Sequence, residues 1–134
     1  MKRWRWWLLA AGIPCVIACG GSGTYEARGT ATSPASAARI SVGKAEGANA
    51  VDVDVRHLAL PEHVGDGYSQ YAVWIVPEGR LPILAGTLDL DRDSQRGVLR
   101  ATTPYDRFEV LVTAERDDLA RGPTGPIVLH RSIP

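Results

Sequence analysis

The sequence predicts an all-β domain, an antiparallel β-sandwich of about seven strands with an immunoglobulin-like or related Greek-key topology. From Arg39 onward, apolar residues recur at every second position, which is the period of a strand with one buried face. Short apolar runs alternate with turn residues such as Pro, Gly and Asp, and this spacing is typical of a sandwich. No segment of ten or more residues shows a helical stripe, so we expect no long helix.

Two segments carry the clearest strand signals. In residues 51–55, "VDVDV", three valines share one face and two aspartates share the other, as in a strand with one face in solvent. Residues 71–77, "YAVWIVP", are apolar on both faces, which suits a central strand that ends in a Pro-Glu-Gly turn.

The other expected strands show weaker patterns. In residues 83–90, Gly86 is a candidate β-bulge. Residues 107–115 alternate, which places Thr113 and Glu115 on the face opposite Phe108. The remaining expected strands are residues 39–45, 97–102 and 127–132.

The first 18 residues have the layout of a lipoprotein signal peptide. Three basic residues precede a 13-residue apolar run, which is shorter than the roughly 20 residues that a membrane-spanning helix needs. The run ends in "VIAC", which resembles a bacterial lipobox with Cys19 as the acceptor of a covalent diacylglycerol. The alternative is an ordinary secretory signal peptide with an incidental cysteine. A metal or redox pair of Cys15 and Cys19 is disfavoured because no further Cys or His follows nearby.

Residues 19–38 then read as the lipidated Cys19 followed by a flexible linker. Residues 20–38 are rich in Gly, Ser, Thr and Ala and offer almost no large apolar side chain to bury. As a random coil they would reach about 25 Å. We therefore expect residues 39–134 to form the sandwich domain.

The charge balance excludes some classes of partner. Three of the fifteen basic residues and none of the fifteen acidic residues precede Cys19, so the remaining chain carries a formal net charge of −3. Nucleic-acid-binding domains show a basic face instead, so we expect no nucleic-acid partner.

Candidate chemistry is sparse. Asp89, Asp91 and Asp93 have the spacing of the first calcium-loop ligands, but Ser94 stands where that loop needs Gly and Arg100 where it needs Glu. A solvated hairpin turn explains these aspartates better, and no metal site is expected. The three histidines, His57, His63 and His130, fall in strand or loop patterns. No nucleophile motif or zinc-protease motif is present, so we expect no enzyme.

Two aromatic residues allow two interpretations. Tyr71 and Trp74 lie in the central apolar strand, where aromatic residues are usually part of the core. The alternative is that they line a ligand pocket.

Residues 38–132 resemble the extracytoplasmic C-terminal domain of the anti-sigma-K-factor family. The likeness rests on the alternating strand at 51–55, on Tyr71 and Trp74 followed by an apolar pair, and on Glu115 before a loop and the closing "PTGPIVL" at 123–129. The resemblance implies a β-fold and an extracytoplasmic setting. It implies no catalytic residues. Family members also carry a sigma-binding domain and a membrane span, which this sequence does not show, so direct sigma-factor contact is not expected.

These observations predict a lipid-anchored protein of the bacterial cell envelope with a non-enzymatic interaction or sensory module. Its partners would be the membrane, through the anchor, and another envelope protein, with a possible link to extracytoplasmic sigma-factor regulation. Gly20 rather than Asp follows Cys19, which favours the outer membrane, facing the periplasm, over the inner membrane. The alternative function is binding of calcium or a small ligand.

Overall fold

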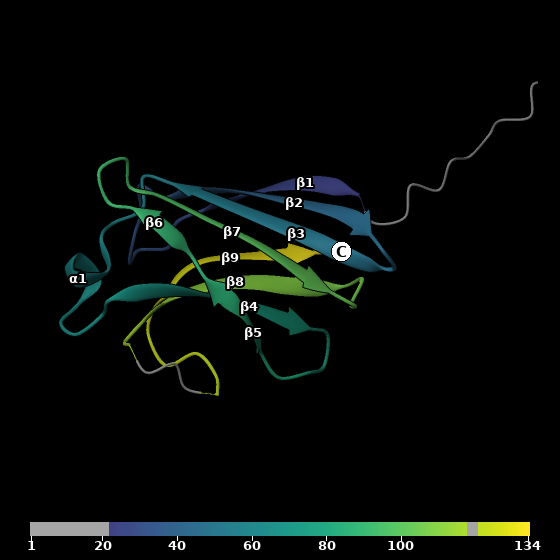
Figure 1. The fold of residues 1–134 in the computed structure, drawn as a ribbon. Helices are drawn as coiled ribbons and strands as arrows, with labels where there is room; N and C mark the ends of the chain where they lie inside the picture. Colours follow the sequence, from purple (N-terminus) through teal and green to yellow (C-terminus); the bar gives the residue numbers. More distant parts are fainter. Residues whose placement is uncertain (1–21, 118–120) are drawn as a thin grey trace, which may run out of the picture.

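The computed structural model describes residues 22–117 and 121–134. Within these residues two antiparallel sheets pack face to face (Figure 1). One sheet has the strand order β1-β2-β3-β7-β6 and the other β5-β4-β8-β9. The elements are β1 (Gly23–Arg28), β2 (Ala37–Ala45), β3 (Ala48–Arg56), α1 (Pro61–Val64), β4 (Gln70–Pro77), β5 (Ile83–Thr87), β6 (Asp89–Asp91), β7 (Arg96–Thr103), β8 (Phe108–Glu115) and β9 (Ile127–Ile133). The predicted antiparallel sandwich is confirmed.

The core lies between the two sheets and follows the period-two pattern. Val51, Val53 and Val55 of β3 are buried, whereas the aspartates between them lie on the outer face. Phe108, Val110 and Val112 of β8 close the core from the other sheet. Full burial of each such side chain contributes roughly 1.5–3 kcal/mol, so these strands account for much of the folding energy.

The expected strand at 83–90 is two strands in different sheets. Its first half is β5, an edge strand beside β4, and its second half is β6, an edge strand beside β7. The register of β4 and β5 shifts between the pairs Val73↔Gly86 and Trp74↔Leu84, so the irregularity lies next to the position expected for a bulge. The chain therefore crosses from one sheet to the other at Leu88.

The prediction of a flexible linker over residues 20–38 is wrong from Gly23 onward. Residues Gly23–Arg28 form β1, which pairs with β2 in register from Gly23↔Val42 to Arg28↔Ala37. The domain therefore includes residues before Arg39, from Gly23 onward among the described residues. Tyr25 and Ala27 point inward against the core, and backbone pairing compensates for the scarcity of large apolar side chains.

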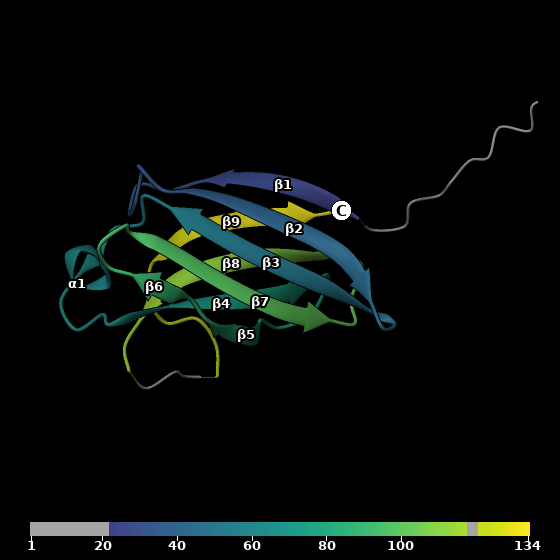
Figure 2. The ribbon, with the colours of Figure 1, turned by 45° about the horizontal axis from the view of Figure 1, so that its top comes forward.

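The sandwich has two ends, which are named here by their distance from the start of β1. The proximal end holds the start of β1, the β2–β3 turn, the β4–β5 loop and the C-terminus. The distal end holds the 29–36 loop, α1 and the β6–β7 turn (Figure 2). In the part of the chain that the structure describes, no helix has the length and apolar character needed to cross a membrane.

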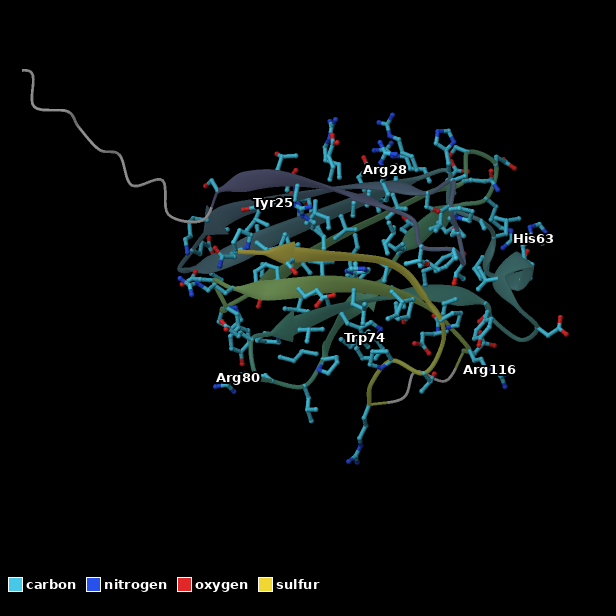
Figure 3. All side chains as sticks on the ribbon, turned by 180° about the vertical axis from the view of Figure 1, so that it is seen from behind. Tyr25, Arg28, His63, Trp74, Arg80 and Arg116 are labelled. Carbon is cyan, nitrogen blue, oxygen red and sulfur yellow. The ribbon has the colours of Figure 1, made fainter. Side chains whose placement is uncertain are left out.

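Strand β4 is buried on both faces, as predicted for a central strand. Tyr71 faces the core between the sheets, where its hydroxyl donates to the Ala59 carbonyl, and burial raises its pKa to about 12. Trp74 points to the opposite face, where it packs with Ala72 and Leu111 in a separate small cluster (Figure 3). Phe108 belongs to the main core, so it does not share this small cluster with Trp74.

Replacing Trp74 tests this second cluster. Trp74 is only 1% exposed, so Trp74→Ala should lower the free energy of unfolding by about 3–5 kcal/mol. That loss is a large share of the roughly 5–15 kcal/mol of a domain of this size. Urea unfolding, followed by circular dichroism, measures the difference.

Leu81→Ala is the matched control, because Leu81 is 84% exposed and its loss should change stability by less than about 0.5 kcal/mol. If residues 1–18 are removed as the predicted signal peptide, Trp74 is the single tryptophan that remains. Emission typical of a water-exposed indole in the folded protein would show that the cluster does not form.

Candidate functional site

The outer face of the β1-containing sheet is a ladder of opposite charges. Arg96 of β7 donates two hydrogen bonds to Asp54 of β3, at 2.9 and 2.7 Å. Arg100 donates to Asp52, one step along the same two strands, at 2.7 Å. The hydrogen bond from Arg96 lowers the pKa of Asp54, and the charges of Arg56 and Arg39 add to this effect against the opposing effect of burial. Arg56 and Arg39 therefore lie close enough to Asp54 for their positive charges to stabilise its ionised carboxylate.

Beside this ladder, three arginines surround a small residue. The register places Arg28 of β1, Ala37 of β2 and Arg56 of β3 in one row across the sheet. The next row on the same face is Glu26, Arg39 and Asp54. We call the space bounded by Arg28, Arg39 and Arg56 around Ala37 the arginine hollow. It is part of a cavity of about 540 Å³, and Arg28 stands on this outer face in Figure 3.

The fourth wall of the arginine hollow is the loop that joins β1 to β2. Pro34, Ala35 and Ser36 line the cavity. The backbone N–H of Gly29 donates to the Ser36 carbonyl at 2.7 Å, which closes the loop at its base. Only glycine fits at this position, because a Cβ on Gly29 would lie 1.8 Å from the Ser33 carbonyl oxygen.

Two of the three arginines in the hollow keep their charge unpaired. Neither Arg28 nor Arg56 forms an ion pair within 4.0 Å among the described residues. Arg39 contacts Glu26 at 3.9 Å, and both side chains are largely exposed, so this pair is weak. The hollow is thus a positively charged depression on a domain of net negative charge.

A buried carboxylate on the other sheet organises the β8–β9 loop. Glu115, at the end of β8, is 1% exposed and has no cationic partner among the described residues. Its Oε1 accepts hydrogen bonds from Thr113 Oγ1 at 2.7 Å, Thr124 N at 3.0 Å and Gly125 N at 3.3 Å. Its Oε2 accepts from Thr124 Oγ1.

The same network reaches Trp74. The indole Nε1 donates to Thr113 Oγ1 at 2.9 Å, so Trp74, Thr113 and Glu115 form one chain of hydrogen bonds. Gly125 must be glycine in this arrangement, since a Cβ there would lie 1.6 Å from the Ala114 carbonyl oxygen. Burial alone would raise the pKa of Glu115, but the hydrogen bonds from Thr113, Thr124 and Gly125 outweigh it and hold the pKa below the ordinary value of 4.5.

The three aspartates with calcium-loop spacing form the expected hairpin turn. Asp91 ends β6, and its Oδ1 accepts the backbone N–H groups of Asp93 and Ser94 at 3.0 and 3.3 Å. These backbone hydrogen bonds lower the pKa of Asp91. Asp89 and Asp93 are exposed beside it. The carboxylate of Asp91 is thus occupied in shaping the turn that joins β6 to β7.

The histidines are spread over the molecule. His57 follows β3, and His63 lies on α1 at the distal end (Figure 3). His130 lies on β9, with Nδ1 3.4 Å from Glu109. No group of three or more His, Cys, Asp or Glu residues that could hold a metal ion occurs within residues 22–117 and 121–134. Cys19 and the predicted signal peptide at 1–18 lie outside these residues.

Sequence patterns did not reveal the arginine hollow. Arg28 falls in the segment expected to be a linker, and only the pairing of β1 with β2 brings it beside Ala37. One signal was available, because "TYEAR" alternates inward Tyr25 and Ala27 with outward Glu26 and Arg28. Alternation placed Glu115 on the face opposite Phe108, but it did not reveal that Thr124 and Gly125 of the β8–β9 loop donate to its carboxylate.

Comparisons with protein-family models, with curated proteins and with solved structures found no match. The resemblance to the anti-sigma-K domain therefore stays a prediction.

Glu115→Gln tests the buried network. At neutral pH this change should lower the free energy of unfolding by about 1–3 kcal/mol, because donors bind a carboxylate more strongly than an amide. Since the pKa of Glu115 is lowered in the folded state, its stabilising effect is complete above pH 4.5 and is lost as the pH falls through the folded-state value. The difference in the free energy of unfolding between wild type and variant should therefore decrease below about pH 4.5. Urea unfolding at neutral and acidic pH measures it.

Glu78→Gln is the control, since Glu78 is an exposed carboxylate in the β4–β5 turn. If Glu115→Gln behaves like Glu78→Gln at both pH values, the carboxylate does not hold the loop.

Proposed function

We propose that this chain is a lipid-anchored envelope protein whose β-sandwich is a non-enzymatic interaction module. The observation that carries the proposal is the position of β1. Only residues 20–22 separate Cys19, the predicted acceptor of the diacylglycerol, from the first residue of β1. The anchor and the folded domain are therefore adjacent in the chain.

This spacing sets how far the domain stands from the membrane. Four residue steps join Cys19 to Gly23, and a fully extended chain covers at most about 3.6 Å per step, or roughly 14 Å. A lipidated Cys19 would thus hold the start of β1 close to the bilayer surface. The roughly 25 Å linker expected from composition would have allowed free rotation, whereas this short connection restricts the orientation of the domain.

With that orientation, the proximal end faces the membrane. The β4–β5 loop lies at this end, as the position of Arg80 in Figure 3 shows. Its tip presents Leu81, which is 84% exposed and has the apolar character that suits the interfacial region of a bilayer. The distal end, with the 29–36 loop, α1 and the β6–β7 turn, then projects away from the membrane.

The distal half is accordingly where an envelope partner would bind. The arginine hollow and the 29–36 loop lie on this half, within reach of a protein or ligand in the surrounding compartment. A domain that binds a partner but catalyses no reaction would serve a sensory or scaffolding role. One such sensory role would be in an extracytoplasmic sigma-factor circuit, which the family resemblance alone suggests.

Cys19→Ala tests the anchor. The wild-type protein should partition into detergent and begin at a Cys19 that carries the acyl mass, because the thiol is the site of lipid attachment. The variant should lose both properties. Mass spectrometry of the membrane fraction shows where each chain begins and whether it carries the acyl mass. A wild-type N-terminus at a residue other than Cys19 would contradict the proposal.

A second arm of the same experiment tests the orientation. Cys15 would be removed with the signal peptide and Cys19 would be blocked by lipid, so Leu81→Cys supplies a single free thiol for a fluorescent label. In vesicles with spin-labelled lipids, this label should be quenched. The matched label at Asp93→Cys, in the β6–β7 turn, should stay bright. Equal quenching at both positions would mean that the proximal end does not face the membrane.

A further inference from the structure

We propose that the arginine hollow binds the phosphate group of a small phosphorylated molecule. This site goes beyond the proposed function, because it assigns a ligand class, and it does not depend on the lipid anchor. The chemistry follows from the residues that surround Ala37.

The arrangement of side chains suits an oxyanion. Arg28 and Arg56 stand on either side of Ala37, and Arg39 lies in the next row on the same face. Guanidinium groups present planar forks of donors that match the oxygens of a carboxylate or a phosphate. The Ala37 methyl group leaves space between the two flanking arginines, and the cavity of about 540 Å³ is within the usual range for small-molecule sites.

The charge balance favours a doubly charged group over a carboxylate. Asp54 is occupied by the two hydrogen bonds from Arg96, so the carboxylate that is free to offset the hollow is Glu26. Three guanidiniums against this one carboxylate leave two positive charges. A phosphomonoester carries about −1.5 to −2 charges near neutral pH, which matches this excess.

The walls of the hollow are held in place without a ligand. The strand pairing fixes the spacing of Arg28, Ala37 and Arg56. The 29–36 loop is closed by the Gly29–Ser36 hydrogen bond and by a hydrogen bond between the buried hydroxyl groups of Ser33 and Ser36. Binding would therefore need to order the arginine side chains but not the backbone around them.

Calorimetric titration of the full chain in non-ionic detergent, at constant ionic strength, tests the proposal. The titrants are a sugar phosphate, inorganic phosphate and the unphosphorylated sugar. We expect the sugar phosphate to bind and the sugar not to bind. The double variant Arg28→Gln/Arg56→Gln should raise the Kd at least tenfold. The matched control Arg107→Gln/Arg121→Gln removes the same charge from exposed positions outside the hollow and should leave the Kd unchanged.

A third variant distinguishes binding inside the hollow from a general attraction of the phosphate to positive charge. Ala37→Leu keeps all three arginines but fills the space between them, so it should also raise the Kd at least tenfold. Thermal unfolding confirms that each variant is folded. Inorganic phosphate binding as tightly as the sugar phosphate would support the same site and identify free phosphate as the ligand. Failure of both phosphates to bind at millimolar concentration, equal losses in the two double variants, or unchanged binding by Ala37→Leu would overturn the proposal.

Discussion

The pairing of β1 with β2 is the interaction on which the rest of this structure depends. Among the described residues, β1 forms an edge of its sheet and has β2 as its single hydrogen-bonded neighbour. The loop that follows it bonds to the opposite sheet, because Thr30 donates from its backbone N–H to the Val128 carbonyl and from Oγ1 to the Ile127 carbonyl. Arg131 of β9 also lies over the ring of Tyr25, 5.7 Å from its centroid. One short segment thus links both sheets along one side of the sandwich.

Both proposals follow from that segment. If residues 23–28 were a free linker, Arg28 would not stand beside Ala37, and the arginine hollow would lose one wall. The lipid anchor would then also be separated from the domain by about twenty residues instead of three. The β1–β2 register therefore determines the shape of the ligand site and the predicted distance from the membrane together.

Sequence patterns predicted most of the sandwich and missed the features that tertiary contacts create. The alternation of "VDVDV" and the two-sided apolar character of "YAVWIVP" were sufficient to predict β3 and β4 as strands, because burial of these faces dominates the folding energy. The composition of residues 23–28 predicted a linker instead of the strand β1. Only Tyr25 and Ala27 face inward there, and the strand is held by backbone pairing and by contacts distant in sequence. Alternation also placed Thr113 and Glu115 on the face opposite Phe108, but it did not predict their burial there, where Thr124 and Gly125 of the β8–β9 loop supply donors for the carboxylate.

Amide hydrogen exchange of residues 23–28 shows whether β1 is paired with β2 in solution. An edge strand in an antiparallel pair directs alternate N–H groups to its neighbour. We therefore predict that alternate amides of β1 are protected to a degree comparable with those of the β2–β3 pair, while the amides between them exchange quickly. Exchange of all six β1 amides at the rate of an unstructured peptide, with β2 and β3 still protected, would show that the segment is a linker. The arginine hollow and the short connection to Cys19 would then both be wrong.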